Sequence, residues 1–307
     1  MIGSHVRADR FDYLIVGVAP SNEAALTSNE SGHRFLLIVC TSALLSECWY
    51  DLGIHAMTPS KPVTRIQLCG PTVIEWDGER IDGRLPGRQG RLLFAFLVLN
   101  RHRLATRDNL VEALWPRQHP SATEAGFNAV ISKLRKALGP GVIDGRSSVR
   151  LQLGAGAVVD VETAAKAVHQ AESRVALGQW KRAWGPSLVA LLVAEREFLP
   201  GEDAPWIDEE RHHLADIRLR ALESYAAASL GTGGTELPAA IRAARQLIHL
   251  VPVRESGYQM LMQALASQGN VAEALDVYAR LREVLREELG VSPSAKTQAV
   301  YDQLLHA

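Results

Sequence analysis

The chain has 307 residues, which predicts about two domains of roughly 150 residues each. Hydrophobic residues make up 47% of it and charged residues 22%, a globular composition that excludes a disordered chain or a coiled-coil rod. The formal net charge of −1, taken over the whole chain, argues against a nucleic-acid binder.

The charge is unevenly distributed along the chain. Residues 1–64 contain 4 basic residues (Lys or Arg) and 6 acidic residues (Asp or Glu). Residues 65–158 contain 14 basic and 8 acidic residues, and residues 159–307 contain 15 basic and 20 acidic residues. The middle segment is therefore basic, whereas the C-terminal half is acidic. This asymmetry indicates that one part of the chain contacts phosphate and another does not.

Cysteine content and hydropathy indicate a cytoplasmic protein. The three cysteines, Cys40, Cys48 and Cys69, fit no zinc spacing and are interpreted as reduced thiols. The most apolar run, residues 35–45, is about 11 residues long, whereas a membrane span needs about 20. No export signal precedes it. We expect no metal, no cofactor and no membrane contact.

Residues 1–64 form an N-terminal extension with little pattern. Residues 13–18 and 35–40 are apolar enough for short buried strands. Met57 precedes a Pro-containing, flexible segment. Two alternatives stay open: the extension is translated, or translation starts at Met57. No function is assigned to it.

Residues 65–158 predict strands, three helices and a hairpin, in that order. Asp77-Gly78 between β-prone runs is typical of a hairpin turn. The dense apolar residues of 88–100 predict a buried helix, and Thr106 is the expected N-cap of a second helix that ends near Trp115. A capping box at residues 121–124 begins a third helix that ends at Gly139. Residues 142–146 and 149–153 predict the hairpin.

The third helix has two different faces. Its buried stripe is predicted to contain Phe127, Ile131, Leu134 and Leu138. The other faces carry small, polar and basic side chains, which suit the DNA major groove and the phosphate backbone. Together with two arginines of the following hairpin they form the predicted DNA-binding set: Asn128, Ala129, Ser132, Lys133, Arg135, Lys136, Arg146 and Arg150. The order of elements predicts a winged helix-turn-helix.

Residues 159–307 predict an all-α domain. Leu237, Ala240, Ile241, Ala244 and Leu247 precede small or apolar residues at the same spacing, 34 residues later. A 34-residue period is typical of tetratricopeptide repeats. The expected fold is mainly α with little β: a winged-helix domain at 65–158 and a tetratricopeptide-like helical-repeat domain at 159–307.

Specific motifs make the chain similar to a known family. Residues 109–116 read NLVEALWP and residues 127–139 read FNAVISKLRKALG. The C-terminal part has PW at 205–206, EAL at 273–275, YARLR at 278–282 and EELGVSP at 287–293. Over residues 65–307 the chain resembles the Streptomyces antibiotic regulatory protein family. Those proteins join a response-regulator-type winged helix, without a receiver domain, to a bacterial transcriptional activator domain.

The resemblance implies a transcriptional activator of a secondary-metabolite gene cluster. It implies binding to direct repeats of double-stranded DNA, which a homodimer would occupy, and recruitment of RNA polymerase holoenzyme. By matching position, the third helix is the recognition helix. The loop that follows the second helix would contact polymerase through Trp115, Pro116, Arg117, Gln118 and His119.

Other functional signals are weaker. Glu209 and His213 have the spacing of metal ligands but lack a third ligand. The glycines of residues 231–235 are interpreted as a turn between helices, and Trp180, Trp184 and Trp206 as helical core. No nucleophile stands beside a base, so no enzyme is expected. Two alternatives remain: a helical-repeat interaction module whose winged domain does not bind DNA by itself, and an effector-sensing regulator.

Overall fold

The computed structural model describes residues 64–76, 78–116, 120–154 and 156–306, and the backbone of four short strands between residues 6 and 36. Residues 1–59 and 60–307 form separate units. In the first, β1 (Val6–Ala8) pairs with β2 (Phe11–Tyr13), and β3 (Leu26–Ser28) with β4 (Arg34–Leu36). The rest of the two strand segments expected there lies outside the described residues.

The second unit begins with a four-stranded sheet in the order β11-β5-β6-β7. Its strands are β5 (Arg65–Gln67), β6 (Val73–Trp76), β7 (Glu79–Arg80) and β11 (Val158–Val159). The predicted hairpin is confirmed by the pairing of Trp76 with Glu79, with Gly78 at a φ of 83° in the turn. β11 was not predicted, because two residues that pair with a strand some 90 residues earlier leave no local pattern.

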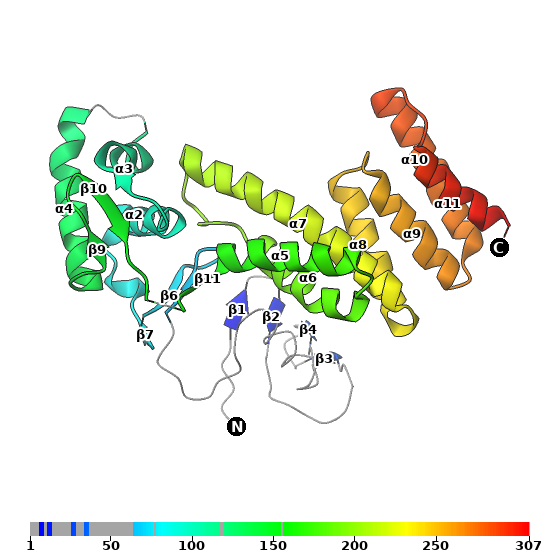
Figure 1. Ribbon diagram of the computed structural model, residues 1–307, viewed down its shortest axis with the longest axis horizontal. Helices are drawn as coiled ribbons and strands as arrows, with labels where there is room; N and C mark the ends of the chain where they lie inside the picture. Colours follow the sequence, from blue (N-terminus) through cyan, green and yellow to red (C-terminus); the bar gives the residue numbers. More distant parts are fainter. Residues whose placement is uncertain are drawn as a thin grey trace. The chain divides into compact units, whose positions relative to one another are not determined.

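Three helices follow, close to their predicted positions (Figure 1). A short 3₁₀ turn, Asp82–Arg84, leads into α2 (Gly87–Leu99), which is followed by α3 (Arg107–Leu114) and α4 (Pro120–Leu138). Thr106 caps α3 as predicted: its Oγ1 accepts a hydrogen bond from the Asn109 amide, and the Asn109 side chain accepts one from the Thr106 amide. α2 is largely buried because apolar residues cover most of its surface, and Leu93 and Phe94 are 0% exposed.

A second, three-stranded sheet in the order β8-β10-β9 confirms the predicted hairpin. β9 (Ile143–Asp144) pairs antiparallel with β10 (Ser148–Leu151). β8 (Ala105–Thr106) pairs with the other edge of β10 and leads directly into α3. The N-terminus of α3 is therefore fixed beside the hairpin.

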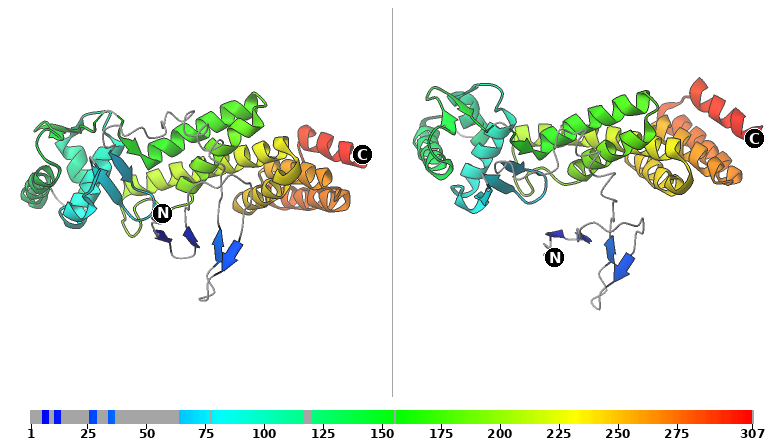
Figure 2. Two further views of the ribbon diagram at one scale, coloured as in Figure 1. Left: turned by 90° about the horizontal axis from the view of Figure 1, so that it is seen from below. Right: turned by 60° about the horizontal axis from the view of Figure 1, so that its bottom comes forward.

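Residues 160–305 are helical. The helices are α5 (Asp160–Ala176), α6 (Trp180–Ala194), α7 (Pro205–Thr232), α8 (Leu237–Leu250), α9 (Glu255–Ser267), α10 (Val271–Leu289) and α11 (Ala295–Leu305). Successive helices pack on one another, as the green-to-red part of Figure 2 shows. A shared core joins α8 to α11 and contains Ala240, Ala244, Ala274 and Leu281, residues of the predicted 34-residue repeat. The chain is mainly helical with little β structure, as expected.

The glycine-rich turn was placed too early in the sequence. α7 continues through Thr232, and the chain turns only at Gly233, whose φ is 70°. Gly231 lies inside α7, and the indole of Trp180 packs directly on it: an added Cβ would lie 2.3 Å from the ring. The glycine thus serves a close approach between helices rather than a loop.

Candidate nucleic-acid interface

α4 has the two predicted faces. Phe127, Ile131, Leu134 and Leu138 are at most 7% exposed, so the predicted buried stripe is confirmed. Ala129, Ser132, Lys133 and Lys136 are exposed. The hydrophobic effect fixes the buried stripe against α2 and α3, and the rest of the helix follows from the 3.6-residue period.

The centre of the exposed face has no partner within the described part of the chain. Ser132, Lys133 and Lys136 make neither a hydrogen bond nor an ion pair with any described residue. Ala129 adds only a methyl group between them. This face therefore has two free ammonium groups and one free hydroxyl group, next to a small side chain that permits close approach of a ligand.

Asn128, on the flank of that face, is held by α3. Arg107 Nη2 donates a hydrogen bond of 2.6 Å to Asn128 Oδ1. The same guanidinium lies 4.7 Å from the centre of the Phe127 ring, and its Nε is 3.7 Å from Glu124 Oε1. Sequence reasoning missed Arg107, because a residue in the first turn of the preceding helix has no periodic relation to Asn128.

Arg135, seven residues later on the same flank, is held by the hairpin. Its guanidinium donates a hydrogen bond to the carbonyl oxygen of Gly145, at the hairpin tip. The Gly145 amide in turn donates to Asp144 Oδ1 at 2.8 Å. The structure thus places Arg135 between α4 and the hairpin, where it joins the two elements.

The hairpin itself presents two exposed arginines. Arg146 is exposed at the tip, and Arg150 is exposed on β10, where it pairs across the ladder with Asp144. Gly145 has a φ of 93°, and an added Cβ would lie 1.9 Å from the carbonyl oxygen of Ser148. Only glycine fits this tip.

The loop after α3 is described only at its start. Trp115 is the C-cap residue that follows α3, and its ring lies beside α4, 3.7 Å from where a Cβ on Gly126 would be. Pro116 is half-buried. Arg117, Gln118 and His119 lie outside the described residues.

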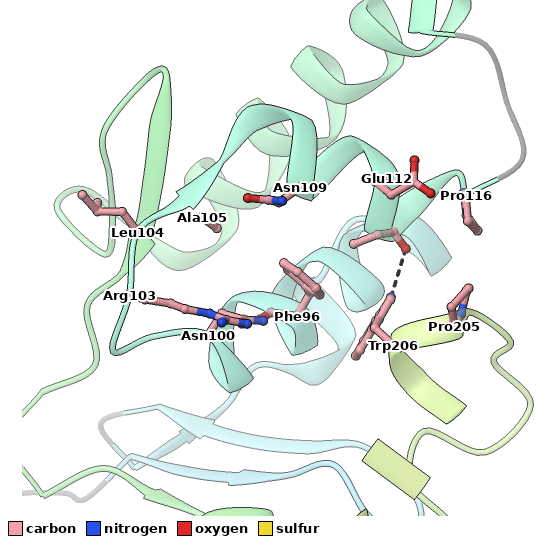
Figure 3. A pocket seen from close by; sticks show the side chains of 11 residues that line it. Phe96, Asn100, Arg103, Leu104, Ala105, Asn109, Glu112, Pro116, Pro205 and Trp206 are labelled. Atoms are coloured by element: carbon pink, nitrogen blue, oxygen red, sulfur yellow. Dashed lines mark hydrogen bonds between the residues drawn. The ribbon is translucent and has the colours of Figure 1, made fainter. Parts of the chain in front are cut away.

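An open pocket of about 440 Å³ lies where α2, α3 and β8 meet the start of α7 (Figure 3). Trp206 forms one wall. Its indole packs edge-on against two phenylalanine rings, with 5.3 Å between ring centres for Phe96 and 6.2 Å for Phe198. Its Nε1 donates a hydrogen bond of 3.0 Å to the carbonyl oxygen of Ala113. The sequence pattern assigned this tryptophan to the helical core. Instead, it joins the first turn of α7 to α2 and α3, an arrangement that local patterning does not reveal.

A partly buried carboxylate ties α5 to the sheet β11-β5-β6-β7. Asp160 Oδ2 accepts hydrogen bonds from the backbone amides of Leu68 at 2.9 Å and Cys69 at 2.8 Å. Burial raises the pKa of Asp160 despite these hydrogen bonds. Burial, and then the nearby Glu209 and Asp160, raise the pKa of Glu210 to about 7. These carboxyl groups lie where the sheet meets the helices, away from the exposed face of α4.

The described residues contain no group of three or more side chains arranged to hold a metal ion. His213, which has the ligand spacing from Glu209, is exposed on α7, as is His212. None of the helices described is both long and apolar enough to cross a membrane.

The helical part of the chain matches a known family. Residues 159–305 match the bacterial transcriptional activator domain family. The chain is 32% identical over 256 residues to the regulatory protein AfsR of Streptomyces coelicolor, covering 83% of this chain and 25% of AfsR. It therefore spans about a quarter of the length of that relative.

Two other relatives are of more similar length. The transcriptional regulator RedD of Streptomyces coelicolor is 27% identical over 264 residues, which is 78% of this chain and 70% of RedD. The solved structure of Mycobacterium tuberculosis EmbR, in complex with a low-affinity phosphopeptide, superposes with a TM-score of 0.69 at 24% identity. It covers 80% of this chain and 66% of that one, and it supports the fold alone.

Proposed function

Because the chain belongs to the Streptomyces antibiotic regulatory protein family, we propose that it is a sequence-specific DNA-binding transcriptional activator. The observation that carries this proposal is the exposed face of α4, where Lys133, Lys136 and Ser132 have no partner among the described residues. Exposed basic and hydroxyl groups on a helix with small neighbours suit a major groove.

We propose that residues 65–158 form a winged helix-turn-helix domain and residues 159–307 the activator domain. Three helices followed by an antiparallel hairpin support the first assignment, with α4 as recognition helix and β9–β10 as wing. The 14 basic against 8 acidic residues of 65–158 support contact with phosphate there. Arg146 and Arg150 would contact the DNA backbone through the wing.

The transcriptional role follows from the relatives. AfsR and RedD are named as regulators, and we propose that this chain activates a secondary-metabolite gene cluster by recruiting RNA polymerase. Trp115 and Pro116, at the start of the loop 115–119, are the proposed contact. Binding to direct repeats as a homodimer is proposed with it.

DNA binding is tested with the full chain and DNA from the regions flanking its own gene. Binding is measured across a salt series, with unrelated DNA as competitor. We expect one fragment to survive competition, with an affinity that falls as salt increases. A folded protein that binds no fragment would contradict the proposal and favour the helical-repeat interaction module.

Activation is tested separately, by run-off transcription with polymerase holoenzyme on the bound fragment. Trp115→Ala is expected to retain DNA affinity within about threefold, since a neutral ring outside the α4 face neutralises no phosphate. The variant is expected to lose most of its stimulation of transcription. The ring of Trp115 also packs beside Gly126, so thermal unfolding is measured in parallel. Full stimulation by the folded variant would exclude Trp115 from the polymerase contact.

A further inference from the structure

The hydrogen bond between α3 and α4 has a chemical direction. A guanidinium only donates hydrogen bonds, whereas an asparagine amide donates through Nδ2 and accepts through Oδ1. The atom of Asn128 that faces Arg107 must therefore be Oδ1, in agreement with its 2.6 Å distance from Nη2. Arg107 thus fixes which end of the amide faces outward.

Arg107 is itself held from several sides. Its backbone amide donates to the carbonyl oxygen of Ser147 in the hairpin at 3.1 Å. Its guanidinium lies 4.7 Å from the centre of the Phe127 ring and is approached by Glu124. Its side chain is only 29% exposed. A cation over an aromatic face, beside a carboxylate, loses freedom and holds its orientation.

The outward end of Asn128 is a donor. Nδ2 carries two N–H groups and makes no hydrogen bond with any described residue, and the side chain is exposed. In the major groove, acceptors are N7 and O6 of guanine, N7 of adenine and O4 of thymine, whereas cytosine presents only a donor, N4. An outward Nδ2 would thus favour the first three bases over cytosine.

We propose that Arg107 is a positioning residue that determines base preference: it holds Asn128 so that α4 presents a hydrogen-bond donor at this position. The inference rests on the proposed function, because it requires α4 to lie in the major groove. Arg107 itself touches no base in this arrangement. Its removal would free the amide to turn and present either end.

The test is selection of bound duplexes by the full chain from a library randomised within the fragment that it prefers. For the wild type we expect one position that rejects cytosine about fivefold, the effect of one hydrogen bond. Arg107→Ala is expected to reduce that preference toward none while it keeps the preferences at the other positions. Arg282→Ala, which removes an exposed arginine on α10, is the matched charge control and should change no preference.

Asn128→Asp supplies a second, independent variant. Its carboxylate keeps a partner for Arg107 but can only accept, so the preference at the same position is expected to reverse toward cytosine or adenine, which present amino donors. Thermal unfolding of each variant checks the fold. If Arg107→Ala does not fold, Asn128→Asp can still overturn the proposal, because the proposal requires the outward end of the Asn128 side chain to contact the base.

Three results would overturn the proposal. In the first, Arg107→Ala weakens binding equally on all sequences and reduces the salt slope by about 0.9, as a residue that neutralises one phosphate would. In the second, Arg107→Ala leaves both affinity and preference unchanged. In the third, Asn128→Asp selects the same bases as the wild type. A wild type that selects no sequence at all contradicts the proposed function instead, and the inference falls with it.

Discussion

At the scale of single residues, some side chains on the outward side of α4 form hydrogen bonds with other described elements, and others form none. Asn128 is held by Arg107 and Arg135 by the hairpin tip. Lys133 and Lys136 are exposed and unpaired among the described residues. We therefore expect the two lysines to provide most of the binding to phosphate, whereas Arg135 acts by joining the helix to the hairpin.

Removal of either lysine tests this division. Lys133→Ala and Lys136→Ala are each expected to weaken binding to a similar extent on specific and unrelated DNA, and to reduce the salt slope by about 0.9 for each phosphate that the lysine neutralises. Lys296→Ala, which removes an exposed lysine on α11, is the matched control. Binding that equals the parent's on every DNA would show that α4 is wrongly placed in the groove.

Glu210 gives a prediction about pH. Its pKa is about 7 in the folded chain against an ordinary 4.5, chiefly because it is buried. A raised folded pKa means that the native state holds the proton more tightly than the unfolded state. The stability that the protonated Glu210 contributes to the fold is fully present below pH 4.5 and is lost as pH rises through about 7.

Glu210→Gln lacks this titration. The free energy of unfolding of the variant, relative to the wild type, is expected to increase between pH 4.5 and 7 and then to level off. Urea denaturation at a series of pH values measures it, with Glu283→Gln on α10 as a control for the removal of one exposed charge. A difference that does not change with pH would mean that Glu210 is not desolvated.

At the scale of elements, the hairpin depends on its tip. β8, β9 and β10 form a small sheet that leads directly into α3, and Arg135 ties the tip to α4. Gly145 permits the turn because its φ is 93° and the Ser148 carbonyl occupies the space of a Cβ. The sheet thus positions both the proposed wing and the N-terminus of α3.

Gly145→Ala is expected to distort the tip and break its hydrogen bond with Arg135. The clash is local, so we expect a decrease of about 1–3 kcal/mol in the free energy of unfolding. We also expect a decrease in DNA affinity that is larger than in the control variant Gly139→Ala. Thermal unfolding and binding titrations measure the two effects. Gly139→Ala, at a positive φ but with no atom near its Cβ position, separates backbone strain from the clash; equal decreases in affinity in the two variants would contradict this account.

At the scale of the whole molecule, residues 60–307 form one unit, in which several interactions join the four-stranded sheet, α2 and α3 to the later helices. Trp206 packs on Phe96 and donates a hydrogen bond to Ala113, Asp160 accepts one from the Cys69 amide, and β11 pairs with β5. The interface is therefore ordered rather than a free linker. We expect the described part of this unit to unfold in one transition.

Trp206→Ala tests that cooperativity. Removal of the indole is expected to reduce stability by about 3 kcal/mol and to separate thermal unfolding into two transitions. Trp206→Phe keeps a ring against Phe96 but leaves the Ala113 carbonyl without this donor, and it should cost about 1 kcal/mol. A single unshifted transition in Trp206→Ala would show that other interactions join the two parts.

The amino-acid sequence by itself determined the three helices and the last hairpin of residues 65–158, and the buried face of α4. Thr106 caps α3, four apolar residues at helical spacing are buried, and the hairpin of residues 142–153 forms where predicted. Each of these rests on local patterning, because caps, turns and amphipathic periods act over a few residues. The family resemblance was readable from motifs for the same reason.

Only the tertiary structure decided which exposed residues the protein itself engages. The partners of Asn128 and Arg135 come from α3 and the hairpin, and Trp206 and β11 find theirs some 90 residues away in the chain. Such interactions depend on how elements pack, so no local period marks them. Gly231 is a glycine because Trp180 packs on it, a reason that the sequence of α7 does not contain.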